Sequence, residues 1–531
     1  MSTSSFLRAL QHLASLLPGS NPLSLIERLR NAEAAESEWR VAGELLLRSD
    51  PAAAASLLEV GVQNLPDAAQ LHYLHGNALR MSGQPAEAEI ALDKAISLDP
   101  AHANASVSLA HLLREQGRMK ALAKVMLALW HHEPRSLEAD RRVLSFLCEC
   151  ARHEEADSLL PALLADPAQD PLLLRRAGEI ALSLGRFEEA QVHLRAALAL
   201  DPDQASTWLR LAHTHQFVDP NDEDLRALQL GAARPDLAED TRIALGFALG
   251  KALDDLGEIA ESVNVFRRAN ADWRKGHRWD RKAWQHSIDA QMHAPAFARS
   301  QVSNPTAPVF IVGLPRSGTT LVETLLARDA QIRSRGELNW IAALARQLGP
   351  RPSSSNLTAA GNFCLAQLRQ DDAPARFHID KNPLNFRHLG LIAAMLPHAK
   401  IIHCRRDLRD TALSLWSQHF AHEDMAWGYD FGDIADYARG QAALMAHWRK
   451  SLPVPILELD YESLVGEPDS TIARVRGFLG LESDAPAANF EQATAISTAS
   501  VWQARQQVHS RSVGRWRRYS DFLPELADIG D

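Results

Sequence analysis

Residues 309–329, VFIVGLPRSGTTLVETLLARD, contain a short apolar run, a loop with two glycines and a helical pattern. The run from Val309 to Val312 is typical of a buried strand. Gly313 and Gly318 permit a tight turn and a close approach of the backbone to a ligand. A strand, such a loop and a helix form an anion site, because backbone N–H groups and the helix dipole both favour negative charge there. We therefore predict a phosphate or sulfate site in an α/β domain with a P-loop-like turn.

The loop has the glycine spacing of a nucleotide triphosphatase loop, G-x-x-x-x-G-K-[ST], but lacks its cation. Thr319 stands where that motif has lysine, whereas Arg316 lies inside the loop and can clamp a phosphate or sulfate with its guanidinium. Thr319 and Thr320 add hydroxyl donors, and Ser317 and Gly318 complete the set of predicted donor-binding loop residues. A triphosphatase or kinase is the alternative, and it would require magnesium-dependent ATP hydrolysis.

A second motif follows in residues 399–416, AKIIHCRRDLRDTALSLW. It predicts a strand from Lys400 to Cys404, with Arg406 at its end and Ser414 eight residues further on the next helix. An arginine at a strand end and a hydroxyl on the following helix can converge on one phosphate. Taken alone, Arg406 would be read as a surface partner of Asp407 or Asp410, but the upstream loop favours the phosphate role.

Together the two motifs resemble the 5′-phosphosulfate loop and the 3′-phosphate segment of sulfotransferases that use 3′-phosphoadenosine 5′-phosphosulfate (PAPS). Within that class the sequence resembles the tyrosylprotein sulfotransferases and their repeat-fused bacterial relatives, over roughly residues 308–518. The resemblance implies a parallel sheet wrapped by helices, with PAPS bound at the carboxyl ends of the strands. It implies no metal, and the sequence contains no His/Cys/Asp cluster with ligand spacing.

Further positions carry the same resemblance. SRGELNW places Glu337 where the family has its catalytic glutamate, and IDKNPLNF places Lys381 where it has a transition-state lysine. ELDYESLVGEP offers Tyr461, which matches a tyrosine beside the donor nucleotide. In ASVWQARQQVHSRSVGRWRRY, Ser500 aligns with a second transition-state stabiliser, and Arg515 stands where the family has lysine before tryptophan.

The charges of these residues suggest a mechanism. An acceptor hydroxyl is a poor nucleophile, so a carboxylate must take its proton, and Glu337 is the candidate. Lys381 and Ser500 would stabilise the charge that builds on the departing nucleotide oxygen. The alternatives are structural: Glu337 could pair with Arg333 or Arg335, and Lys381 with Asp380 on the surface.

The first half of the chain repeats with a period of 34 residues. A proline recurs at multiples of this period, at Pro66, Pro100, Pro134 and Pro202. A glycine follows the same period at Gly83, Gly117 and Gly185, with Ala151 in the remaining position. The stretch SLGRFEEAQVHLRAALALDP, residues 183–202, resembles the tetratricopeptide repeat (TPR). Such repeats are helical pairs that stack into a solenoid with a concave groove.

We therefore expect a TPR-like helical domain over residues 1–275, a linker over 276–304 and a sulfotransferase domain over 305–531. The groove would hold an acceptor protein or peptide, with tyrosine as the first candidate acceptor and a carbohydrate or small molecule as the alternative. The array could instead serve only to form a homodimer or to stiffen the enzyme. A further alternative is an interaction scaffold with an inactive nucleotide-binding domain.

Composition limits the remaining possibilities. The 531 residues carry a net charge of −10, which argues against a nucleic-acid binder. No stretch reaches the ~18 apolar residues that a membrane span needs. Four cysteines are too few for a disulfide framework. We expect a cytoplasmic protein without a membrane span.

Overall fold

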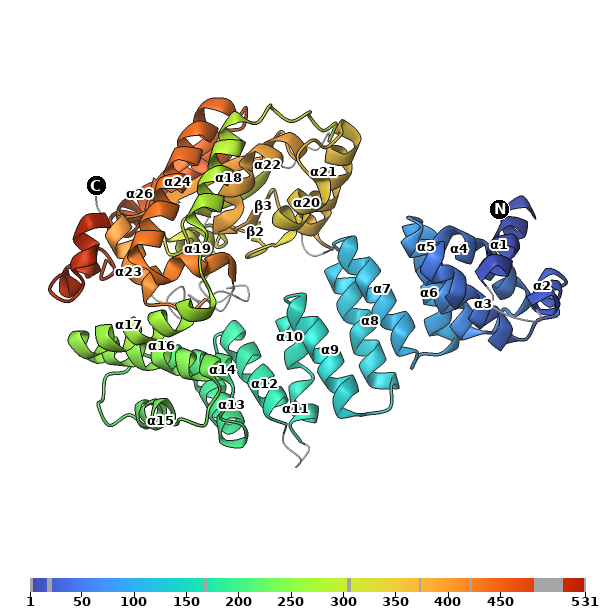
Figure 1. Ribbon diagram of the computed structural model, residues 1–531, viewed down its shortest axis with the longest axis horizontal. Coiled ribbons are helices and arrows are strands. Elements are labelled where there is room, and N and C mark those ends of the chain that lie inside the picture. The colour runs from blue at the N-terminus through green and yellow to red at the C-terminus, as the bar shows by residue number, and fades with distance from the viewer. Residues whose placement is uncertain are drawn as a thin grey trace. The chain divides into compact units, whose positions relative to one another are not determined.

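The computed structural model describes residues 3–16, 22–165, 170–302, 307–371, 374–420, 423–481 and 510–529. Two compact units make up the chain: residues 1–156 with 370–372, and residues 157–369 with 373–531. Figure 1 labels most of their helices, and strands β2 and β3. None of the described helices is both long and apolar enough to cross a membrane.

The first unit is built from successive helices that pack in pairs (Figure 1). These are α1 (Thr3–Leu16), α2 (Pro22–Arg30), α3 (Glu36–Ser49), α4 (Pro51–Asn64), α5 (Ala69–Met81), α6 (Pro85–Leu98), α7 (Ala103–Glu115), α8 (Met119–His132), α9 (Leu137–Glu149) and α10 (His153–Asp157). The periodic glycines lie in the turns within pairs, with φ +78° at Gly83 and +72° at Gly117. Ala151 has φ +55°, so it adopts the same left-handed turn that glycine favours. The predicted period therefore marks one backbone conformation.

Small residues bring the paired helices close together. A Cβ on Gly76 of α5 would lie 2.7 Å from Cγ of Leu92 on α6. In the second unit, a Cβ on Gly178 would lie 2.7 Å from Leu194 on the paired helix. A side chain at either glycine would force the paired helices apart.

The second unit begins with further repeat helices. They are α11 (Leu160–Leu163), α12 (Pro171–Leu184), α13 (Phe187–Leu200), α14 (Ala205–Ala212), α15 (Glu223–Ala232), α16 (Glu239–Leu256), α17 (Ile259–Gly276) and α18 (Arg281–His293). Helix α18 lies within the segment 276–304 that we predicted to be a linker. Its Trp284 stacks on Tyr437 with ring centroids 4.2 Å apart. The domain limits at 275 and 305 stay predictions.

The rest of the second unit is a parallel five-stranded sheet with helices, in the strand order β2-β3-β1-β4-β5. The strands are β1 (Pro308–Gly313), β2 (Ile332–Ser334), β3 (Phe377–Asp380), β4 (Lys400–Arg405) and β5 (Ile456–Asp460). The helices are α19 (Thr319–Leu326), α20 (Trp340–Leu348), α21 (Ser354–Arg369), η1 (Pro383–His388), α22 (Leu389–Met395), α23 (Leu408–Trp416), η2 (Glu423–Tyr429), α24 (Phe431–Ser451), α25 (Tyr461–Gly466), α26 (Pro468–Leu479), η4 (Arg515–Tyr519) and η5 (Pro524–Ile529). The predicted parallel sheet is confirmed.

Strand β1 is buried on both faces, which explains its uninterrupted apolar sequence. Val309 and Ile311 contribute to a core shared with α19 and α26. Phe310 and Val312 face the opposite core, which includes residues of α22, α23 and α24. That second core also contains Phe266 of α17, so the last pair of repeat helices and the sheet share one hydrophobic core.

Candidate functional site

The site lies where the strand order reverses. From β1 the chain runs to β2 and β3 on one side of the sheet, and then to β4 and β5 on the other. Ligands of open α/β sheets bind at the carboxyl ends of the strands beside such a switch point. The loop after β1 and the segment after β4 both leave the sheet there.

The loop after β1 has the conformation that an anion site needs. Arg316 has φ +71° and Gly318 has φ +92°, so two left-handed residues turn the backbone into α19. Ser317 is 2% exposed and its hydroxyl donates to the carbonyl of Leu314 at 2.7 Å, which closes the turn. Thr319 is buried at the start of α19, where helix N–H groups are free to bind an anion.

Glycine is required at Gly318 because Tyr461 covers it. A Cβ on Gly318 would lie 2.5 Å from the ring of Tyr461, the first residue after β5. The guanidinium carbon of Arg406 lies 4.6 Å from the centroid of the same ring. The structure thus brings Tyr461, Arg406 and the loop together, although they come from three separate strands.

A direct hydrogen bond joins the two predicted phosphate motifs. Nε of Arg316 donates to the hydroxyl of Ser414 on α23 at 2.9 Å. Arg406 donates from Nη1 to the carbonyl of Arg316 at 3.0 Å and from Nη2 to that of Ser512 at 2.6 Å. Its Nε is buried without a hydrogen-bond partner among the described residues. The alternative pairing of Arg406 with Asp407 is wrong, because Asp407 instead pairs with Arg409.

Three guanidinium groups concentrate positive charge at this point. Burial, followed by the charges of Arg406 and Arg515, lowers the pKa of Arg316 to about 10. Burial also lowers the pKa of Arg406, and the charge of Arg515 acts in the same direction. Such a cluster destabilises itself unless an anion binds between its members. The region therefore suits a ligand with more than one negative group.

Glu337 and Lys381 meet just beyond the ends of β2 and β3. Nζ of Lys381 lies 2.5 Å from Oε1 of Glu337. The side chain of Lys381 is fully buried, so the surface pairing with Asp380 that we considered is wrong. Arg335 donates to the carbonyls of Leu368 and Arg369 instead of pairing with Glu337.

Sequence reasoning missed a second carboxylate at Lys381. Oε2 of Glu323, on α19, lies 3.6 Å from Nζ of Lys381, and the hydroxyl of Ser334 donates to Oε1 of Glu323. Burial raises the pKa of Glu323, although the charge of Lys381 opposes this shift. A signal was present, because Glu323 is the only charged residue in the helix TTLVETLL. Buried charges in such helices usually have a partner.

Asp380 is a further buried carboxyl group in this region. It accepts hydrogen bonds from Nδ2 of Asn385 at 3.0 Å and from the backbone N–H of Leu338 at 3.4 Å. Burial nevertheless raises the pKa of Asp380 to about 8. Ser500, the other predicted transition-state residue, lies outside the described residues.

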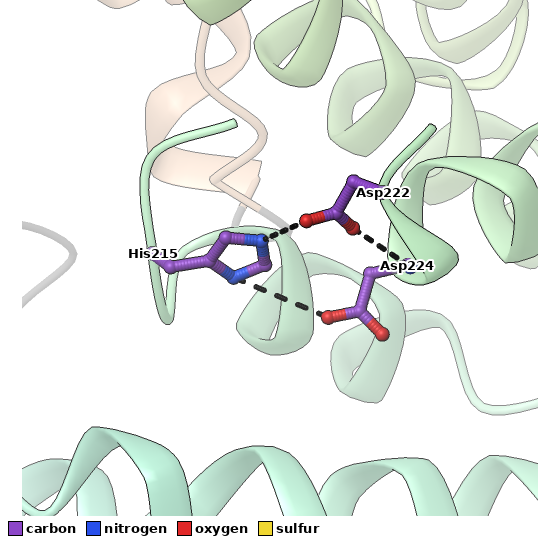
Figure 2. A group of neighbouring side chains, drawn as sticks. All are labelled: His215, Asp222 and Asp224. Atoms are coloured by element: carbon purple, nitrogen blue, oxygen red, sulfur yellow. Dashed lines mark hydrogen bonds and ion pairs between the residues drawn. The ribbon is translucent and has the colours of Figure 1, made fainter. Parts of the chain in front are cut away.

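Within the described ranges, one group of His and Asp side chains has ligand atoms within 4.8 Å of one another: His215, Asp222 and Asp224 (Figure 2). Nε2 of His215 lies 3.3 Å from Asp222, whereas Nδ1 lies 4.0 Å from Asp224, so the carboxylates approach opposite ring nitrogens. Asp222 also caps α15, and Arg195 binds Asp224 at 2.7 and 3.0 Å. We interpret these contacts as structural, because they hold the loop between α14 and α15 in place. The absence of a metal from the reaction stays a prediction.

Comparison with known proteins identifies the two parts of the chain. Residues 308–485 match the model of the sulfotransferase family, and residues 69–102 and 149–214 match tetratricopeptide repeat models. The chain carries a sulfotransferase-family domain joined to tetratricopeptide repeats. This confirms the resemblance recognised from the motifs around Arg316 and Arg406.

Several curated proteins are similar to this chain at low identity. An uncharacterized protein of Aquifex aeolicus is 28% identical over 404 residues, covering 71% of this chain and 52% of that protein. The chain thus spans about half the length of that relative. Protein-tyrosine sulfotransferase 1 of Danio rerio is 23% identical over 278 residues, covering 47% of this chain and 77% of that enzyme. A solved sulfotransferase from Alicyclobacillus acidocaldarius aligns with a TM-score of 0.25 at 15% identity, covering 43% of this chain and 95% of that one.

Proposed function

We propose that the chain is a PAPS-dependent sulfotransferase that transfers a sulfuryl group to an acceptor hydroxyl. The hydrogen bond from Arg316 to Ser414 carries the proposal. It joins the loop after β1 to the helix after β4, so groups suited to two separate phosphates lie side by side. The buried, unpartnered Nε of Arg406 fits an anionic ligand there.

The donor would supply an activated sulfuryl group, and the residues of this chain would hold it and move one proton. In the transfer, the acceptor oxygen forms a bond to sulfur, the bond between sulfur and the nucleotide oxygen breaks, and the nucleotide keeps the electron pair. Glu337 would take the acceptor proton. Lys381 would stabilise the negative charge on the nucleotide oxygen.

The ion pair between Glu337 and Lys381 must loosen for these roles, because a carboxylate held by a cation is a weak base. Glu323 offers Lys381 a second carboxylate at 3.6 Å. We propose that Lys381 moves toward Glu323 and the nucleotide oxygen as Glu337 accepts the proton. Glu323 is then a positioning residue for Lys381.

Tyrosine in a protein or peptide is the first candidate acceptor. Several relatives of low identity are protein-tyrosine sulfotransferases, and the repeats provide a peptide-sized surface. Helix α20, which follows Glu337, carries Arg346 as its only basic residue. We therefore expect weak selection for acidic residues around the acceptor, and we keep a carbohydrate or small phenol as the alternative acceptor.

A transfer assay with radiolabelled PAPS tests this proposal. The acceptors are tyrosine peptides with and without flanking acidic residues, an oligosaccharide and a small phenol. Glu337→Gln should abolish transfer while binding of adenosine 3′,5′-bisphosphate persists. Glu188→Gln, at an exposed position on α13, is the matched control. Turnover that survives Glu337→Gln would contradict the base role.

A further inference from the structure

Arg515 is held by two carboxylates from different parts of the second unit. Asp410, near the start of α23, accepts hydrogen bonds from the backbone N–H groups of Gly514 at 2.6 Å and Trp516 at 2.9 Å. Asp254, in the last turn of repeat helix α16, forms an ion pair with the Arg515 guanidinium. Asp410 therefore places the backbone of Arg515, and Asp254 directs its side chain.

Tyr519 completes this arrangement. Its hydroxyl donates to the second oxygen of Asp254, and Nη2 of Arg515 donates to the same hydroxyl at 3.0 Å. The carboxylate of Asp254 is 13% exposed. A little-exposed carboxylate with two donors from one short segment has few other orientations available.

Helix α16 is a firm support for that carboxylate because the last repeat pair packs on the sulfotransferase part of the unit. Phe266 of α17 lies edge-on to Trp416 of α23, with centroids 5.8 Å apart. Nδ2 of Asn270 donates to the carbonyl of Trp416 at 3.0 Å in a buried position. Phe247 of α16 packs against Phe266. Ser414 is on the same helix as Trp416, so α16 and the phosphate motifs share one framework.

Electrostatics show why Arg515 needs a partner. Its charge lowers the pKa of both Arg316 and Arg406, so the three guanidinium groups repel one another. Burial acts most strongly, and against the charged form of Arg515, but the charges and hydrogen bonds of Asp254 and Tyr519 together outweigh it and raise the pKa of Arg515. Without Asp254, the Arg515 side chain would reduce this electrostatic repulsion by turning away from Arg316 and Arg406.

A second residue of the repeats also lies within electrostatic reach of the site. His213 follows α14, and burial, then the charges of Lys251, Arg316 and Arg210, lower its pKa to about 3. The imidazole is therefore neutral at pH 7. The ends of both α14 and α16 thus lie close to the arginine cluster.

We propose that Asp254 is a positioning residue for donor binding, through which the last repeat pair orients Arg515 toward the anionic donor. This inference rests on the proposed function. It makes the end of α16 part of the sulfotransferase site, so the repeats contribute to donor binding as well as to any acceptor binding.

Titration calorimetry of the full chain with adenosine 3′,5′-bisphosphate tests the proposal. We expect Asp254→Asn to bind the bisphosphate about tenfold more weakly, the scale of one charge-assisted hydrogen bond, and Asp254→Glu to restore most of the affinity. A decrease in affinity would distinguish positioning from a simple charge effect, because loss of a negative charge beside an anion site would by itself strengthen binding. Equal or tighter binding by Asp254→Asn would therefore overturn the proposal.

A double-mutant cycle separates positioning from a general structural effect. In an Arg515→Met background, Asp254→Asn should weaken binding no further, whereas a general distortion would weaken it again and overturn the proposal. Glu525→Gln is the matched control, because it breaks another ion pair between the repeats and the C-terminal segment, with Arg267, and should leave affinity unchanged.

Tyr519→Phe gives a second measurement if Asp254→Asn does not fold, because it keeps both charges and removes the hydroxyl that donates to Asp254 and accepts from Arg515. We expect binding about threefold weaker, because the ion pair between Asp254 and Arg515 remains; unchanged binding would count against the proposal. If the wild-type chain does not bind the bisphosphate, the proposed function itself fails. If the wild type binds and Asp254→Asn binds equally, only the role of Asp254 fails.

Discussion

Replacing Lys381 with methionine removes a buried cation from between two carboxylates. Nζ of Lys381 lies 3.6 Å from Glu323, and unit charges at that separation attract by roughly 5 kcal/mol at an effective dielectric constant of about 20. The desolvation of both groups offsets about half of this attraction. Glu337 is 44% exposed, so solvent screens its contribution. We expect Lys381→Met to lower the free energy of unfolding by about 2–3 kcal/mol at pH 8.

The loss of stability in Lys381→Met should be smaller at pH 5 than at pH 8. Burial already raises the pKa of Glu323 in the presence of Lys381, and removal of the cation raises that pKa further. A carboxyl group with a raised pKa in the folded state destabilises the fold as pH increases from its unfolded pKa to its folded pKa. Near pH 5 Glu323 can take a proton, so the variant no longer contains a buried, unpaired carboxylate.

Calorimetric unfolding at pH 5 and pH 8 measures both effects. The series is the wild type, Lys381→Met, Glu323→Gln and the double variant. At pH 8 the double variant should be more stable than Lys381→Met alone, because glutamine leaves no charge to bury. An equal loss at both pH values, without recovery in the double variant, would refute this account of the pair.

Three further predictions concern single positions. Gly178→Ala should lower the free energy of unfolding by about 1–3 kcal/mol, because the new Cβ would lie 2.7 Å from Leu194. In the control Gly477→Ala the new Cβ meets no atom within 4 Å, so this variant should be neutral or slightly stabilising. Melting temperatures of the two variants test the difference. Asp380, with a pKa raised to about 8, keeps a proton in the folded state that the unfolded chain loses above about pH 4. The free energy of unfolding of the wild type should therefore fall between pH 4 and pH 8, by up to about 1.4 kcal/mol per pH unit. Asp380→Asn should flatten this dependence of stability on pH. Arg316→Ala should abolish bisphosphate binding in a titration while the fold, followed by circular dichroism, persists, because it removes both the clamp and the bond to Ser414.

Local patterns predicted the local structure well. The apolar run after residue 308 is strand β1, and the loop that follows has the left-handed residues that an anion site requires. The 34-residue period corresponds to a repeated turn, down to Ala151 with positive φ. In these cases neighbouring residues determine the backbone, so sequence spacing is sufficient.

Side-chain pairs between residues far apart in the sequence were harder to predict. Asp254 and Arg515 are 261 residues apart, and nothing near either residue indicates the other. Glu323 was missed because it lies on α19, after β1, whereas its partner, Lys381, follows β3. Helix α18 was read as linker because it buries only Trp284 and Ile288, which is too few apolar residues for a clear helical period.

Titration calorimetry of the purified chain with adenosine 3′,5′-bisphosphate, in parallel with ATP and magnesium, tests the central claim most directly. In the proposed function, Arg316, Arg406 and Ser414 hold two separate phosphates, and Thr319 stands where triphosphatases have lysine. We predict micromolar binding of the bisphosphate and little binding of ATP. Tight, magnesium-dependent ATP binding, or no bisphosphate binding by a folded sample, would contradict the assignment of this site to PAPS.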